Sequence, residues 1–144
     1  MDALSVAATV VGLISFCVDV GSYLADVKNA PKNAERLHAQ VLSLRQVLGN
    51  LDAFLQGENA KCKTFAKTCA LVQSTEACKY HLVRLSEKLR RVNKTILHRV
   101  TFPLDEKDIN QSIEILRGCA QTFQFSLTVD GWYALSLCEV YSWN

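Results

Sequence analysis

The sequence predicts an all-α protein, a bundle of four or more helices built around a hydrophobic N-terminal helix. Residues 3–18 form a run of sixteen residues without a single charge. Three later segments repeat apolar residues at spacings of three and four, as helices with one buried face do. No segment alternates with period two for long enough to form a strand. Segments with such apolar seams pack side by side, and a chain of 144 residues is expected to form one domain.

The opening run decides how the protein is interpreted. A secretory signal needs a basic start, but Asp2 is the only charged side chain before the run, so a signal peptide does not fit. A membrane span needs about 20 mostly apolar residues, and Asp19 closes this run early. A helix that is apolar nearly all round is usually buried in a core. The composition therefore favours a core helix and leaves membrane insertion as the alternative.

Small and polar side chains recur every three or four residues within this opening helix. Such spacing places them on one narrow stripe of its surface. A stripe of this kind suits a helix that packs closely against copies of itself in lipid. The predicted packing stripe contains Ser5, Thr9, Gly12 and Ser15, and Asp2, Asp19 and Ser22 continue its spacing.

The second and third helices are predicted from their apolar seams and from the residues that interrupt them. Pro31 suits the first turn of the second helix, and the residues Gln-Gly-Glu-Asn at 56–59 break it. The third helix is expected over residues 78–96. The predicted core positions are Leu37, Val41, Leu44, Leu48, Leu51 and Leu55, followed by Cys78, Leu82, Leu85, Leu89, Val92 and Ile96.

The fourth helix has the clearest start signal in the sequence. Asp105 can cap the helix, and Leu104 and Ile109 have the spacing of a hydrophobic staple. Its predicted core positions are Ile109, Ile113, Leu116, Ala120, Phe123 and Leu127. The pair Asp130 and Gly131 signals a turn or helix end. We therefore expect the bundle to occupy residues 1–131, and residues 132–144 to form an apolar tail or part of a further helix.

Charge is distributed unevenly around a net value of +2. Residues 61–99 carry ten Lys and Arg against two Glu, which makes the third helix the basic element. Such a face can meet anionic lipid headgroups, although a solvated basic face is the alternative. Nucleic acid is not an expected partner, because Tyr80 is the only aromatic residue among the cations from Lys79 to Arg99 and no binding motif is present. The candidate headgroup residues are Arg84, Lys88, Arg91 and Lys94.

The sequence offers little for catalysis. Six cysteines without a paired C-x-x-C motif indicate reduced thiols in a cytosolic setting, most of them small core residues. Cys78 and His81 form a lone C-x-x-H, but no second pair at a suitable spacing would complete a zinc site. His38 and His98 lack catalytic partners, and no glycine-rich phosphate loop occurs. We therefore expect no enzyme activity, no cofactor and no metal.

Three stretches resemble, in order, the fungal HeLo-like domains. They are the opening "MDALSVAATVVGLISF", the segment "DVKNAPKNAERLHAQVLSLRQVLGNLDAFL" with its Ala-Pro entry, and "HRVTFPLDEKDINQSIEILRGCAQTFQFSLTVDG" with its aromatic-Pro break. The likeness extends to about Gly131, and its specificity comes from the ordered set. The resemblance implies a bundle around a hydrophobic first helix, found at the front of fungal NACHT-type and ankyrin-repeat receptors.

The resemblance also implies a function. HeLo-like domains are regarded as death-inducing domains that act on the plasma membrane. By this likeness the chain is expected to be a cytoplasmic cell-death or immune effector that oligomerises, relocates to the plasma membrane and inserts its first helix. The implied membrane-inserting residues are Leu4, Val6, Val10, Val11, Leu13, Ile14, Phe16 and Val18.

The expected partners are anionic membrane lipids, other copies of the chain and a NACHT or ankyrin-type receptor. The chain departs from the family pattern because it ends soon after the domain. Two interpretations follow, namely a free-standing effector or the end of a truncated gene. The alternative function is a soluble adaptor module of a fungal NOD-like receptor, without membrane activity.

Overall fold

The structure is a computed structural model, and it describes residues 3–26, 31–56, 69–93 and 104–142. Side chains are described within 6–26, 31–56, 73–89 and 104–128. The predicted all-α fold is confirmed, because these ranges contain four helices and no strand. The helices are α1 (Ala3–Asp26), α2 (Lys32–Gln56), α3 (Cys69–Asn93) and α4 (Glu106–Ser142).

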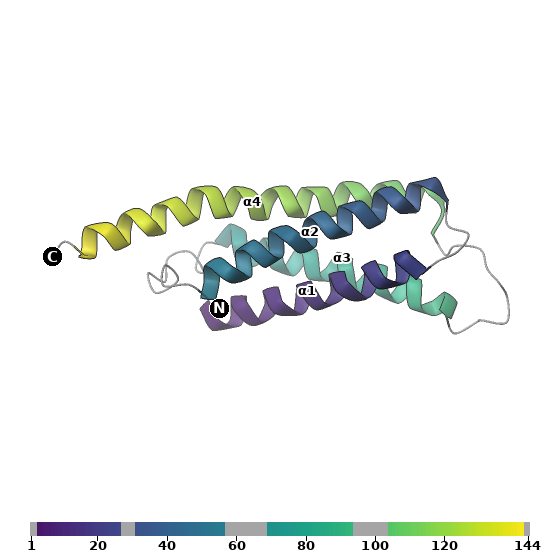
Figure 1. The fold of residues 1–144 in the computed structure, drawn as a ribbon, viewed down its shortest axis with the longest axis horizontal. Coiled ribbons are helices and arrows are strands. Elements are labelled where there is room, and N and C mark those ends of the chain that lie inside the picture. The colour runs from purple at the N-terminus through teal and green to yellow at the C-terminus, as the bar shows by residue number, and fades with distance from the viewer. Residues whose placement is uncertain (1–2, 27–30, 57–68, 94–103, 143–144) are drawn as a thin grey trace.

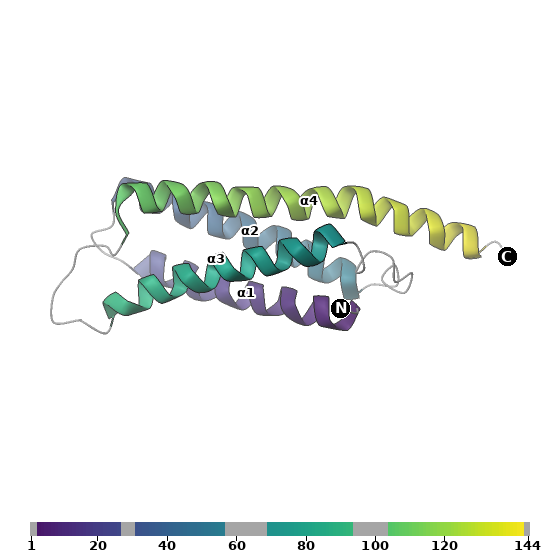
Figure 2. The same cartoon turned by 180° about the vertical axis from the view of Figure 1, so that it is seen from behind.

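The four helices form a bundle in which consecutive helices run in opposite directions (Figure 1). Helix α1 packs against α2 and α3, and α4 packs against the same two helices. Helices α1 and α4 therefore lie at opposite corners of the bundle. The reverse view shows α3 alongside α4, with α1 beneath them (Figure 2). This arrangement leaves one side of each helix facing outward.

One apolar core runs along the bundle axis, and the predicted seams supply it. All six predicted positions of α2 are buried, as are Cys78, Leu82, Leu85 and Leu89 of α3. In α4 the predicted positions from Ile109 to Phe123 are buried, and Leu127 is half-buried against the core. The side chain of Val92 and the whole of Ile96 lie outside the described residues.

The start of α4 matches its sequence signals. The backbone N–H of Asp108 donates a 2.7 Å hydrogen bond to Oδ1 of Asp105, which is the expected N-cap bond. The backbone N–H of Ile109 also bonds the Asp105 carbonyl oxygen at 3.0 Å. Leu104 and Ile109 are both buried in the core cluster, as a hydrophobic staple requires. The cap and the staple together fix where the last helix enters the bundle.

The predicted helix end at Asp130 and Gly131 is wrong, because α4 continues through both residues to Ser142. An internal glycine costs only about 1 kcal/mol relative to alanine, and good helix formers follow it here. Residues 132–142 therefore extend α4 rather than form a separate element. In both ribbon views this end of α4 projects beyond the other three helices (Figures 1 and 2).

The core assignment predicts large losses of stability on truncation of buried leucines. Replacement of Leu44, Leu89 or Leu116 by Ala is expected to lower the free energy of unfolding by about 2–5 kcal/mol each, because each change leaves a cavity. Leu42→Ala is the matched control, since Leu42 is 46% exposed on the same helix as Leu44. Denaturation followed by circular dichroism measures the difference. Equal losses at Leu42 and Leu44 would contradict this core.

The cap predicts a smaller, residue-specific effect. Asp105→Ala is expected to lower the free energy of unfolding by about 0.5–2 kcal/mol, because the N–H of Asp108 loses its acceptor. Asp105→Asn retains a side-chain oxygen that can accept this bond, so it should recover most of the loss. Urea denaturation at neutral pH compares the two variants. The cap has no role if they are equally destabilised.

Candidate functional site

The inward side of α1 is part of the core. Among the predicted membrane-inserting residues, Val6, Val10 and Leu13 are buried at 0–1% exposure. Three further buried side chains continue the same side of the helix, namely Cys17, Val20 and Leu24. In this state these six apolar side chains of α1 are buried, and the helices that pack against α1 are α2 and α3.

The outward side of α1 is uncharged from Ala8 to Val18 and carries the exposed carboxylates of Asp19 and Asp26 beyond that point. Val11 and Val18, which were assigned to the inserting set, are 49% and 37% exposed. With Ser15 between them they follow helical spacings of three and four, and small residues extend the line at both ends. We call this the outer stripe, and its exposed members are Ala8, Val11, Ser15, Val18, Ser22 and Ala25.

The predicted inserting residues and packing stripe therefore do not form two separate faces. Ile14 and Phe16 are half-buried against the core cluster. Thr9 and Gly12 are half-buried at the flank of the outer stripe. Ser15 alone of the predicted packing residues with a described side chain is exposed. The side chains of Leu4 and Ser5 lie outside the described residues. A Cβ added to Gly12 would meet no atom within 4 Å, so the backbone there is open to close approach.

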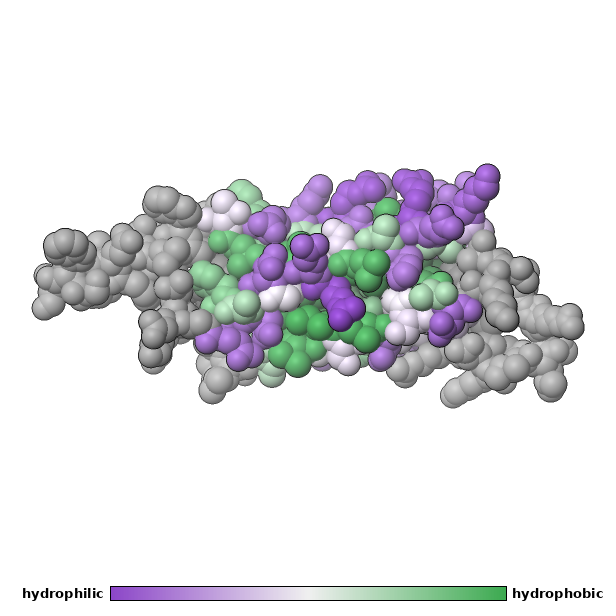
Figure 3. Space-filling view, viewed as in Figure 1, coloured by the Kyte–Doolittle hydropathy of each residue, from purple (hydrophilic) through white to green (hydrophobic). Residues whose placement is uncertain are grey.

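The sequence pattern did not mark Ala8 and Ala25 as members of this surface, and it grouped Val11 and Val18 with the apolar inserting residues without indicating that both are exposed in the bundle. The signal was present, because small or β-branched uncharged residues repeat at positions 8, 11, 15, 18, 22 and 25. Figure 3 shows hydrophobic side chains reaching the surface on the edge formed by α1, whereas the α4 edge is mostly hydrophilic. Hydrophobic side chains also reach the surface across the middle of this face (Figure 3).

Helix α1 also has the dimensions of a membrane span. Among the described residues, its segment Val6–Asp26 is the one long and apolar enough by length and composition, with 33% of it buried. A core helix of a soluble protein passes the same test. Asp26 is exposed at the C-terminal end of the segment, where it would lie close to a membrane interface, whereas the exposed Asp19 lies about 10 Å before that end along the helix axis.

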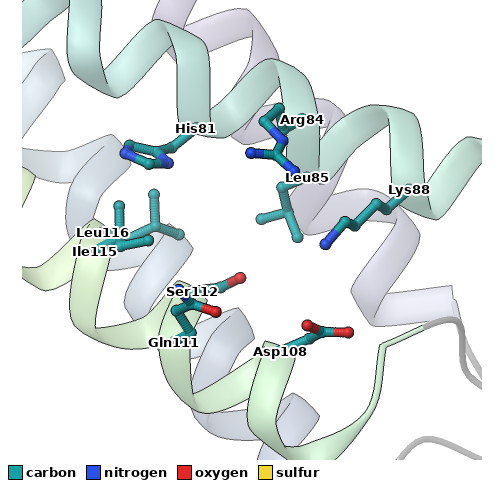
Figure 4. Close-up of a pocket in the computed structure, with 9 residues that line it drawn as sticks. All are labelled: His81, Arg84, Leu85, Lys88, Asp108, Gln111, Ser112, Ile115 and Leu116. Atoms are coloured by element: carbon teal, nitrogen blue, oxygen red, sulfur yellow. The ribbon is translucent and has the colours of Figure 1, made fainter.

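Two of the predicted headgroup residues line a groove between α3 and α4 (Figure 4). Arg84 and Lys88 project from α3 toward Gln111 and Ser112 of α4, with Asp108 at one end. The groove encloses about 160 Å³. Its complete lining is His81, Arg84, Leu85, Lys88, Asp108, Gln111, Ser112, Ile115 and Leu116. The side chain of Arg91 and the whole of Lys94 lie outside the described residues.

Arg84 interacts with the aromatic side chain of Tyr80. Arg84 Nη1 donates a 3.2 Å hydrogen bond to Tyr80 Oη, and its guanidinium carbon lies 5.6 Å from the centre of that ring. The ring of His81 meets the Tyr80 ring edge-on, with 5.4 Å between centroids. No ion pair joins Arg84 or Lys88 to a carboxylate of the described residues. Asp108 is the carboxylate that lines the groove with these two cations.

Three buried or half-buried thiols come from three different helices. Burial raises the pKa of Cys17 on α1 to about 12, and nearby Arg45 partly opposes this rise. Cys78 on α3 and Cys119 on α4 are hydrogen-bonded to each other, which raises the pKa of Cys78 further than burial alone and lowers that of Cys119. No group of three or more His, Cys, Asp or Glu that could hold a metal occurs among the described residues.

Comparison of the chain with family models, with curated proteins and with solved structures gives no match. The likeness to HeLo-like domains therefore depends on the three sequence stretches alone. The fold and the two surfaces described above carry the functional argument.

The thiols predict an order of reactivity. Cys119 is expected to react with iodoacetamide at least about tenfold faster than Cys17 or Cys78, because it is the more exposed and has the lowered pKa. Site-resolved mass spectrometry of the folded chain measures each rate, and the unfolded chain supplies the control in which the rates converge. Equal rates in the folded chain would show that the thiols do not have these surroundings.

Proposed function

We propose that this chain is a membrane-targeting cell-death or immune effector domain that acts by self-association and insertion of α1. The observation that carries the proposal is the outer stripe. From Ala8 to Val18 it is exposed and uncharged, and it lies on a helix with the length and composition of a membrane span. Solvent-facing sides of bundle helices are normally charged or polar, so an uncharged one indicates contact with another apolar surface.

Self-association through the outer stripe is physically reasonable. Small side chains let helix backbones approach closely, and serine hydroxyls can bond across the contact. Val11 and Val18 would leave water on association, which is worth up to about 1.5–3 kcal/mol for each side chain that becomes fully buried. Gly12 leaves open space beside the stripe, so a neighbouring helix can come close at this point.

Insertion would exchange one apolar environment for another. Val10 and Leu13 are out of water in the bundle, and they would also be out of water in lipid. The free energies of the two states can therefore be close enough for oligomerisation or a trigger to shift the balance. Asp26 would sit near the interface, where a charge costs much less than at the bilayer centre, whereas insertion of the whole segment would carry Asp19 deeper at a higher cost.

The cell-death assignment and the proposed location come from the resemblance to HeLo-like domains. A cytoplasmic protein that relocates to the plasma membrane would meet anionic lipids there, and each Lys or Arg near the surface contributes about 1 kcal/mol of attraction. Arg84 and Lys88 are placed to contribute in this way. Other copies of the chain and a NACHT or ankyrin-type receptor are the proposed protein partners.

The alternative is a soluble adaptor, and the same outer stripe is the feature that favours it. An uncharged exposed line on a bundle helix is also a suitable contact for another bundle. The two functions differ in whether α1 leaves the core. Vesicle leakage separates them, because an adaptor associates without opening a membrane.

Insertion predicts that a charge on the outer stripe abolishes membrane activity without unfolding the protein. Val11→Glu is expected to eliminate dye leakage from phosphatidylcholine vesicles containing phosphatidylserine, and to eliminate killing on overexpression in a fungal host. Phe125→Glu is the matched control, because Phe125 is 67% exposed on α4 at the opposite corner. Circular dichroism verifies that both variants fold.

Three results would decide between the proposals. Leakage lost only in Val11→Glu supports insertion. Leakage by Val11→Glu at the parent rate would overturn it. An intact chain that self-associates but releases no dye, with association lost in Val11→Glu, would establish the adaptor instead.

A further inference from the structure

We infer that the groove between α3 and α4 is a binding site for a phosphate group, presented either by a lipid headgroup or by a soluble phosphate compound. The lipid source rests on the proposed function, whereas binding of a soluble phosphate does not. The inference adds a defined ligand site to what the sequence indicated only as a basic helix face. It includes two α4 residues, Gln111 and Ser112, that charge patterning could not identify.

The α3 wall supplies the positive charge. His81, Arg84 and Lys88 lie at successive helical turns, so all three side chains reach the same groove (Figure 4). Arg presents a fixed fork of N–H donors that matches phosphate oxygens, and Lys adds a point charge. The bond to Tyr80 uses Nη1 of Arg84 and leaves its other N–H donors for a ligand. Tyr80 thus restrains the guanidinium before a ligand arrives.

The α4 wall supplies neutral donors. Gln111 and Ser112 face the cations across the groove, with an amide N–H₂ and a hydroxyl that can bond phosphate oxygens. Buried Leu85 and Leu116 line the same groove and limit contact with water. Charged hydrogen bonds are stronger beside such apolar side chains than in open water. Cations on one wall and neutral donors on the other favour an anion over a cation or an apolar ligand.

The size of the groove restricts the ligand. A volume of about 160 Å³ corresponds to roughly five water molecules at about 30 Å³ each. This space accommodates one phosphate group with some retained water, but not a nucleotide. The rest of any larger ligand would extend into solvent or, for a lipid, toward the membrane.

Asp108 at one end of the groove opposes an anion and provides a diagnostic test. Its carboxylate is half-buried, so its repulsion of a bound phosphate is only partly screened. Removal of this charge should strengthen phosphate binding, whereas loss of a cation should weaken it. A nonspecific basic surface would respond to the net charge alone, wherever the change is made.

The test uses the intact ¹⁵N-labelled chain titrated with inorganic phosphate, followed by amide shifts in NMR spectra. Phosphate is expected to shift the amides of Gln111 and Ser112 at saturation. Lys88→Gln should raise the dissociation constant for phosphate about tenfold, because a charged hydrogen bond is lost. Asp108→Asn should lower it. Lys79→Gln is the matched control, because Lys79 is exposed on the same helix outside the groove.

A second arm distinguishes the two sources. The same variants are sedimented with phosphatidylcholine vesicles that contain phosphatidic acid, or phosphatidylserine at equal surface charge. Preference for phosphatidic acid that is lost in Lys88→Gln identifies a lipid source, and binding of free phosphate without this preference identifies a soluble one. Either result supports the site.

The inference is wrong if Lys79→Gln weakens phosphate binding as much as Lys88→Gln, or if phosphate shifts no groove amide. Vesicle leakage is measured separately on the same variants. Leakage without specific phosphate binding leaves the insertion proposal standing and removes only the groove. Phosphate binding without leakage supports the groove as a binding site and contradicts the insertion proposal.

Discussion

Burial of the inward side of α1 against α2 and α3 is the constraint on which the rest of the structure depends. Val6, Val10, Leu13 and their neighbours are too apolar to face water, and two basic or polar-faced helices cover them. The same contact fixes the rotation of α1 about its axis. Once its inward side is set, Val11, Ser15 and Val18 necessarily point outward.

This constraint connects the stability of the bundle with the proposed activity. Transfer of buried apolar side chains to another apolar medium keeps them out of water, so it costs less than their exposure to solvent. The exposed carboxylates of Asp19 and Asp26 both lie in the C-terminal third of α1. Like each of the other helices, α1 has extensive contacts with two of its three neighbours.

The positive charge of the molecule lies on a neighbouring element rather than on α1. Helix α3 packs beside α1 and also forms the groove with α4, so it is adjacent to both candidate surfaces. Arg84 and Lys88 lie on the α4 side of α3, whereas the outer stripe lies on α1. The positive charge of the groove thus lies on α3, and the exposed apolar side chains of the outer stripe lie on α1.

The sequence by itself determined the helices, their buried seams and the start of α4. Local signals suffice for these features, because apolar periodicity and the Asp105 cap act within a few residues. The exception was Asp130 and Gly131, where a weak local break did not end a 37-residue helix.

Only the tertiary structure decided which side of α1 faces solvent and which residues meet Arg84 and Lys88. A helix that is apolar nearly all round has no strong internal preference for one inward side, so its packing partners choose it. The groove joins residues of α3 to residues of α4 that are twenty or more positions away in the chain. No sequence periodicity connects such positions, because their proximity depends on how two helices pack.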